Sequence, residues 1–289
     1  SNAPPAPPSF EEQMPHLSNR YFVVAMVIIC VGLLVGPISL CVFCGGSRRP
    51  HLLWVTPLLA ILASAAILGF ILLAEGIGGR GIYYRITQLN PDGKFAVETE
   101  VESSVTGMLT RRDFQLSEPT WLLDSSAAMD ENQVGLHGNY AQAGTHYSGD
   151  WLASRREQTL FGRTVAPTRA ALRADPAVDG KPPVLHSDFN GLMVDLYYMD
   201  RDGHYWKIDR ITDGQPTRLQ PATAEEFKAA WAENVRTAPN TLDEYLGKIK
   251  PRPGTFFALG SGDASVLEPQ LTGLRWNRFR HIITGAVIE

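Results

Sequence analysis

The chain has 289 residues, of which 44% are hydrophobic and 19% charged, and its formal net charge is −4. These values fit one or two folded domains and exclude a disordered chain, a collagen and a coiled coil. The charge balance provides no positive surface of the kind that binds DNA or RNA, so no nucleic acid partner is expected. The three cysteines all lie before residue 45, which predicts no disulfide in the remainder.

Two apolar blocks follow a flexible, proline-rich start at residues 1–20. The blocks, at 21–44 and 52–75, carry no charge before the final residue of the second, and each is long enough for a transmembrane helix of about 20 residues. The loop at 45–51 is too short to do more than reverse the chain. Its two arginines favour the cytoplasmic side of the membrane. The pattern therefore predicts a two-helix membrane hairpin with a cytoplasmic loop.

This topology predicts a location for the rest of the chain. Residues 76–289 become an extracytoplasmic domain, anchored in a membrane with the lipid bilayer as a partner. Small residues such as Gly36 and Ala60 would let the helices pack closely. They can pack against other membrane or envelope proteins or only against each other, and the sequence leaves both alternatives open.

Beyond the apolar blocks, the pattern changes to the alternation of β-strands. Two hairpins are predicted around turns that contain glycine, at 90–93 and 200–203. Further short strands are expected near 115–123, 158–165, 168–173, 255–259 and 281–288. Helices are predicted only at about 223–236 and 241–249, where Thr223 and Glu226 form a capping box. The predicted fold is a membrane helix hairpin plus a mainly-β domain, antiparallel and β-sandwich-like, with a small αα-hairpin.

Four residues are weak candidates for catalysis. Glu98 and Glu100 share one face of a predicted strand, where two carboxylates could act together as they do in a glycosidase. The plainer interpretation is a solvent-exposed face of polar residues, since the alternate positions are apolar. His146 begins a set that resembles a hydrolase triad, but neighbours on one strand face lie about 7 Å apart, too far for direct proton transfer. Asp200 fits a turn better than a calcium loop.

No cofactor or metal site is predicted. A stretch with the pattern G-x-G-x-x-G at 76–81 precedes a strand, whereas a nucleotide site needs this pattern before a helix. The seven histidines show no metal-binding spacing. Four tryptophans could form a sugar-stacking surface, but in a β-rich domain we first expect them in the core or at sheet edges. They are Trp121, Trp151, Trp206 and Trp276.

Several short segments resemble the C-terminal region of large uncharacterised bacterial membrane proteins, in which a helix hairpin with a basic turn leads into an extracytoplasmic β-rich domain. These segments are Gly36-Pro37, Arg48-Arg49, Trp54-Val55-Thr56-Pro57, the glycine-rich stretch at 76–81, Ser148-Gly149-Asp150-Trp151, Pro167-Thr168-Arg169 and Gly203-His204-Tyr205-Trp206. The resemblance implies a bacterial origin, and with it the bacterial cytoplasmic (inner) membrane as the location and an outward domain. It implies no catalytic residue and no ligand.

The sequence thus favours a membrane-anchored binding or structural module of the bacterial envelope, since no acid, base, nucleophile or metal set is assembled in it. The alternative is an envelope hydrolase acting on glycans. That alternative needs the fold to gather carboxylates such as Glu98, Glu100, Asp195 or Asp200 with His146 in one pocket.

Overall fold

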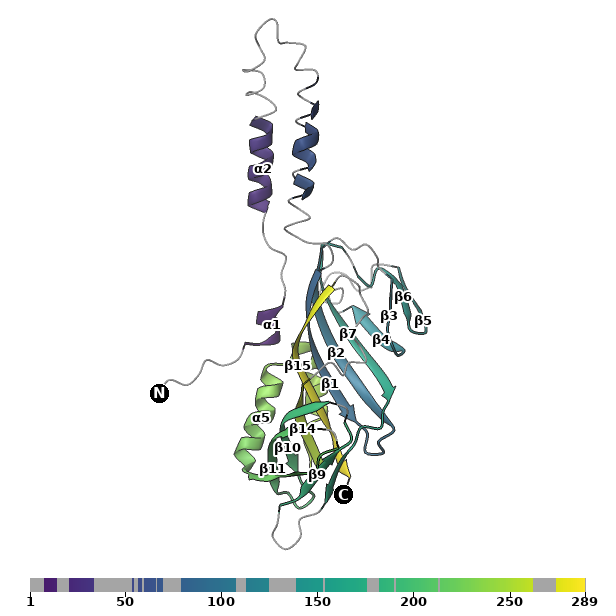
Figure 1. Ribbon diagram of the computed structural model, residues 1–289, viewed down its shortest axis with the longest axis vertical. Helices are drawn as coiled ribbons and strands as arrows, with labels where there is room; N and C mark the ends of the chain where they lie inside the picture. The colour runs from purple at the N-terminus through teal and green to yellow at the C-terminus, as the bar shows by residue number, and fades with distance from the viewer. Residues whose placement is uncertain are drawn as a thin grey trace, which may run out of the picture.

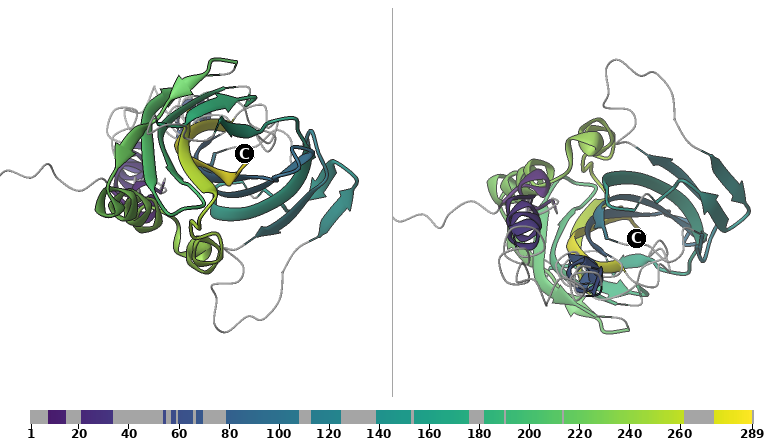
Figure 2. Two further views of the ribbon diagram at one scale, coloured as in Figure 1. Left: turned by 90° about the horizontal axis from the view of Figure 1, so that it is seen from below. Right: turned by 90° about the horizontal axis from the view of Figure 1, so that it is seen from above.

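The computed structural model describes residues 8–14, 21–33, 79–107, 113–124, 139–152, 154–175, 182–189, 191–212, 214–261 and 274–288, and also 54, 57, 58, 60–65 and 67–69. These parts are mainly β-structure. One large sheet curves around on itself, and the C-terminal end of the chain lies inside the curve (Figure 2).

Twelve described strands form this sheet, and its main path has the order β13-β11-β10-β14-β15-β1-β2-β7-β4. Figure 1 labels the strands of this path except β13. Their bounds are Gly79–Leu89 (β1), Phe95–Thr106 (β2), Thr120–Asp124 (β4), Glu157–Pro167 (β7), Leu192–Met199 (β10), Tyr205–Ile211 (β11), Gln220–Ala222 (β13), Thr255–Ser261 (β14) and Leu274–Ile288 (β15). Three strands lie off the path: β8 (Leu172–Asp175), β9 (Val184–Ser187) and β12 (Thr217–Arg218). A second, three-stranded sheet contains β3 (Phe114–Gln115), β6 (His146–Gly149) and β5 (Tyr140–Ala143).

The large sheet is mixed, and this corrects the predicted antiparallel sandwich. β1 is antiparallel to β2 but parallel to β15, and β15 is also parallel to β8. The last strand of the chain therefore lies beside the first strand of the sheet. Side chains alternate with the same period in parallel and antiparallel strands, so the sequence pattern could not reveal this pairing.

Both predicted β-hairpins are present. In the first, Leu89 on β1 lies opposite Ala96 on β2, and Gly93 in the turn has φ 61°. In the second, β10 pairs with β11, and Gly203 in the turn has φ 86°. A residue without Cβ adopts such positive φ angles at little cost, which explains why these turns contain glycine.

Helices lie on the outer face of the sheet beside β14 and β15 (Figure 2). Helix α5 (Ala224–Arg236) begins with the capping box of Thr223 and Glu226, and a 3-10 turn, η2 (Asn240–Leu242), leads to α6 (Asp243–Lys248). Four large apolar side chains of this region are buried: Phe227, Trp231, Leu242 and Leu246.

The predicted membrane helices are not confirmed. The description of helix α2 covers Tyr21–Leu33. In the described parts of the chain, no helix has the length and apolar character needed to cross a membrane. The predicted membrane helix hairpin (21–44 and 52–75) is therefore wrong for the described residues, whereas 34–53, which includes the loop at 45–51, and 70–78 lie outside them.

Several other predictions depended on that hairpin and are corrected with it. The inner-membrane location, the extracytoplasmic placement of 76–289 and the assignment to the bacterial envelope lose their basis, and so does the lipid bilayer as a partner. The two blocks are apolar in composition, as the prediction assumed. Composition shows that a segment is apolar, but it does not show that the segment forms one continuous helix of the length that a bilayer requires.

The core has three apolar clusters. On the inner, concave face one cluster includes Leu89 and Ile283, and another includes Leu160 and Leu274. On the outer face a third cluster joins β1 and β15 to the helices, with Tyr84 as one member. The large sheet therefore buries apolar side chains on both faces.

Candidate functional site

A group of buried polar side chains separates the two inner apolar clusters. We call this group the inner polar belt; its members are Arg85 and Thr87 on β1, Glu98, Glu100 and Glu102 on β2, and His281 on β15. The strand register places Arg85 opposite Glu100 and beside His281. Alternate residues of a strand share a face, so the belt is a direct result of this register.

The centre of the belt is an ion pair between Arg85 and Glu100. Arg85 Nη2 donates to Glu100 Oε2 at 3.1 Å and to Oε1 at 3.2 Å, and Nε donates to Oε2 at 3.3 Å. The guanidinium also lies over the ring of Tyr83, 4.9 Å from its centroid. Burial opposes the charge of Arg85, but the carboxylates of Glu100 and Glu98 outweigh it and raise the Arg85 pKa.

A chain of hydrogen bonds extends from this pair toward His281. Thr87 Oγ1 donates to Glu98 Oε1 at 3.4 Å and lies 2.8 Å from His281 Nε2. Burial, with the positive charges of Arg85 and Arg278, lowers the His281 pKa to about 3, so the ring is neutral at pH 7. Thr87 Oγ1 and His281 Nε2 therefore share a hydrogen bond, in which the tautomer of the neutral ring decides which of the two atoms donates.

The burial of this belt corrects the sequence interpretation of its glutamates. A solvent-exposed face was expected for Glu98, Glu100 and Glu102, yet they are only 4%, 1% and 8% exposed. Alternation identifies the two faces of a strand but not which of them is covered. Here both are covered, and the charged face lies inside the curve because Arg85 on β1 provides the matching cation.

The remaining candidate residues do not join the belt. His146 is exposed on β6 in the three-stranded sheet. Asp200 lies in the β10–β11 turn, where its carboxylate accepts hydrogen bonds from Trp206 Nε1 at 2.9 Å and from the His204 backbone at 2.7 Å. Partial burial would raise the Asp200 pKa, but these hydrogen bonds outweigh it and lower the pKa. Asp195 lies at a break in the β10–β14 register, with φ 49°.

The geometry gives the belt carboxylates a role in holding strands together. Glu100 is occupied by Arg85, and Glu98 by Thr87. Among the described residues, no three or more His, Cys, Asp or Glu side chains are placed to hold a metal ion. The structure thus does not gather the sequence candidates into one open pocket.

A second feature lies on the outer face of β2, β7 and β4, where the helices cover only part of the strands. Thr99 and Val101 are buried, and Arg163 lies over the ring of Tyr245 in α6, but apolar side chains beyond them are exposed. We call the outward surface of β2, β7 and β4 the β2–β7–β4 face. Three of its apolar side chains are strongly exposed: Trp121 at 57%, Val165 at 57% and Phe95 at 39%. Exposed apolar side chains are common singly, but several on adjacent strands form a candidate interaction surface.

The strand register makes this surface continuous. Val165 on β7 lies opposite Val97 on β2, and Trp121 on β4 lies opposite Arg163 on β7. The rings of Trp121 and Phe161 meet edge to face, with their centroids 5.8 Å apart. The apolar side chains therefore form one patch across three strands, and Arg163 carries a positive charge within it.

A basic hollow lies at one end of this face. It has a volume of about 410 Å³ and is lined by Gly93, Lys94, Pro167, Thr168 and Arg169. Pro167 lies opposite Phe95 in the β2–β7 pair, so the hollow adjoins the apolar patch. Lys94 and Arg169 are both exposed. A ligand on this face would meet apolar side chains and, beside them, positive charge.

Sequence reasoning missed both features in part. Trp121 was expected to be a core or sheet-edge anchor. Its exposure depends on the position of β4 at one end of the described sheet path, which the sequence does not reveal. His281 is 194 residues from Thr87 in the chain, and no local spacing connects them. Arg85 could have been found, because a hairpin closed at 90–93 places it across from the glutamate row.

No protein-family model matches the chain, and no curated protein matches its sequence. Among solved structures, it is similar to the yeast delta-COP-I mu-homology domain complexed with a Dsl1 WxWxV peptide, with a TM-score of 0.30, 10% identity, and coverage of 73% of this chain and 96% of that chain. The yeast delta-COP-I mu-homology domain alone gives a TM-score of 0.29, 11% identity, and coverage of 73% and 95%. These TM-scores are too low to assign that fold to this chain. The resemblance to bacterial membrane proteins stays a prediction.

Proposed function

We propose that this chain is a protein-binding module and that the β2–β7–β4 face is its binding surface. The observation that carries the proposal is the exposure of Trp121, Val165 and Phe95 on adjacent strands. Burying such side chains contributes roughly 1.5–3 kcal/mol each. Aromatic side chains also supply most hot spots of protein interfaces.

The proposed partner is a peptide segment with apolar and acidic side chains. Apolar side chains would cover Trp121 and Val165, and the acidic groups would lie near Arg163 or in the hollow at Lys94 and Arg169. This charge complementarity selects against basic partners. The inner polar belt holds the sheet that presents the face and does not contact the partner.

Selection from a random twelve-residue peptide library displayed on phage tests this proposal. The target is the full chain, and the depletion step uses the matched variant Trp121→Ser/Val165→Thr, which keeps both strands but removes the two most exposed apolar side chains of the patch. We expect enriched peptides with two or more apolar residues and at least one acid. A Lys228→Ala variant, altered on the exposed surface of α5, should bind these peptides as the wild type does.

Two outcomes would overturn the proposal. In the first, the library yields no peptide that binds the wild type more tightly than the Trp121→Ser/Val165→Thr variant. In the second, the peptides bind both proteins equally, which would place the binding surface elsewhere. A third outcome would change the partner. If the wild type associates with itself as its concentration rises and the Trp121→Ser/Val165→Thr variant does not, the face binds a second copy of the chain and not a peptide.

A further inference from the structure

Helix α1 (Phe10–Gln13) is docked on the helix-covered part of the outer face (Figure 1). Phe10 is 1% exposed and belongs to the outer apolar cluster. Its ring meets that of Phe279 on β15 edge to face, with centroids 5.6 Å apart. A residue near one end of the described chain thus fills a position between α5, η2 and β15.

One hydrogen bond fixes this docking. The backbone N–H of Asn240, in η2, donates to Glu11 Oε1 at 2.9 Å across 229 residues of sequence. Glu12 lies near Arg236, whose pKa is raised mainly by its hydrogen bond to Glu233 and further by Glu12. Recognition therefore uses an aromatic side chain followed by two acidic residues.

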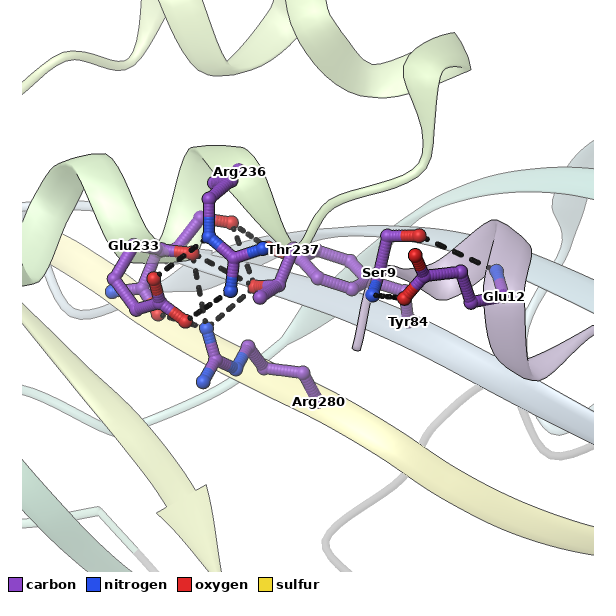
Figure 3. A network of polar contacts seen from close by, with 8 residues as sticks. Ser9, Glu12, Tyr84, Glu233, Arg236, Thr237 and Arg280 are labelled. Carbon is purple, nitrogen blue, oxygen red and sulfur yellow. Dashed lines mark hydrogen bonds and ion pairs between the residues drawn. The ribbon is translucent and has the colours of Figure 1, made fainter. Parts of the chain in front are cut away.

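The other hydrogen bonds of α1 are internal. Ser9 and Glu12 form a capping box, in which Ser9 N donates to Glu12 Oε2 at 2.8 Å and Glu12 N donates to Ser9 Oγ at 3.3 Å (Figure 3). The backbone N–H groups of Ser9 and Glu12 thus have hydrogen-bond partners within the segment, whether or not the segment is docked. In this respect it resembles a short peptide ligand more than an integral part of the fold.

Apart from the Asn240 N–H, the hydrogen bonds of the surface beneath α1 form without α1. Tyr84 donates to the carbonyl of Asn234 at 3.0 Å, and Arg280 Nη1 donates to Thr237 Oγ1 at 2.5 Å and to Asn234 Oδ1 at 3.1 Å (Figure 3). Arg280 also stabilises the C-terminal end of α5, where the helix dipole is negative. Removing α1 would expose apolar surface but break none of these bonds.

We propose that this surface is a peptide-docking site for a short segment with an aromatic residue followed by acidic residues. In the present structure it is occupied in cis by Ser9–Met14. The same segment offered in trans competes for it. The site lies on the covered part of the outer face and does not depend on the β2–β7–β4 face.

The experiment uses a fluorescein-labelled peptide with the sequence of residues 8–14, and measures its anisotropy with full-length chains. A Phe10→Ala chain loses the cis anchor, so we expect it to bind the peptide at least tenfold more tightly than the wild type, in which the tethered segment competes. A peptide with alanine in place of Phe10 should not bind either chain. A second variant, Phe10→Ala/Asn240→Pro, removes the N–H that binds Glu11 and should bind the peptide several-fold more weakly.

Three results would overturn the proposal. In the first, the peptide does not bind the Phe10→Ala chain. In the second, it binds the wild type as tightly as it binds the Phe10→Ala chain. In the third, the peptide with alanine in place of Phe10 binds as tightly as the original peptide. Near-ultraviolet circular dichroism of the Phe10→Ala chain completes the test. Loss of the folded spectrum would show that the segment is an integral part of the core, and would also contradict the proposal.

Discussion

Arg85 and Glu100 face each other across β1 and β2 with both side chains only 1% exposed, and the guanidinium and carboxylate make hydrogen bonds of 3.1 to 3.3 Å. The pair lies between two apolar clusters on the inner face. Burial of two charges is costly, and the cost is offset only when both stay paired. The pair therefore fixes the register of the hairpin more than it adds stability.

The first prediction follows from that cost. Arg85→Met leaves the Glu100 carboxylate buried without its cation, so we expect a loss of about 3–5 kcal/mol in the free energy of unfolding. Urea unfolding monitored by tryptophan fluorescence measures it. The double variant Arg85→Met/Glu100→Leu, which removes both charges, should regain about half of the loss or more. A double variant no more stable than the single one would argue against this role of the pair.

The second prediction concerns pH. The His281 pKa is about 3 in the folded state, against an ordinary value of about 6.5 in the unfolded chain. The unfolded chain therefore binds the extra proton first, and stability falls as pH decreases from 6.5 toward 3. Between pH 6.5 and 5 the expected loss is about 2 kcal/mol. The variant His281→Gln, which can still hydrogen-bond to Thr87 but does not titrate, should lose much less over this interval. Parallel pH profiles for both proteins would contradict the assignment.

The third prediction tests how closely His281 is packed. A Cβ added at Gly260 on β14 would lie 2.5 Å from His281 Nδ1, so Gly260→Ala should destabilise the fold by about 1–3 kcal/mol. Gly247 in α6 is the matched control, because no atom lies within 4 Å of a Cβ there. Gly247→Ala should leave stability unchanged or raise it by up to about 1 kcal/mol. Thermal unfolding of both variants measures the change in stability. If the two substitutions changed stability by similar amounts, the close packing of His281 against Gly260 would be refuted.

Local features of this fold could be predicted from the sequence. The turns at Gly93 and Gly203 and the capping box of Thr223 each depend on residues within a few positions of one another, and all three are present. The parallel pairing of β1 with β15 depends on segments almost 200 residues apart. Strand periodicity contains no information about such a partner.

The candidate site likewise depends on contacts between residues that are far apart in the sequence. Glu98 and Glu100 were noticed as a pair, but their role depends on which face of β2 the rest of the chain covers. His281 joins them only through the return of the last strand. Trp121 is exposed because β4 ends the sheet and the helices cover other strands. In each case the missing information was tertiary contact and not residue type.

The fourth prediction concerns the basic hollow. Replacing Lys94 and Arg169 by Glu should weaken the binding of acidic peptides selected on the wild type by about tenfold at low salt, and by less at high salt. The matched control is Lys228→Glu/Lys250→Glu, which makes the same change in net charge at two exposed lysines that do not line the hollow. Fluorescence anisotropy of the labelled peptides measures the effect. An equal loss in the control variant would attribute it to net charge alone.

The most direct measurement of the central claim is fluorine NMR of the chain labelled with 5-fluorotryptophan, with the Trp121 signal assigned from a Trp121→Phe variant. The free protein should show a Trp121 signal sensitive to solvent, because its side chain is 57% exposed, whereas Trp231 is 9% exposed. On addition of a selected peptide, the account predicts that the Trp121 signal shifts and loses its solvent sensitivity while the Trp231 signal stays in place. A bound peptide that leaves the Trp121 signal unchanged would contradict the assignment of the β2–β7–β4 face as the binding surface.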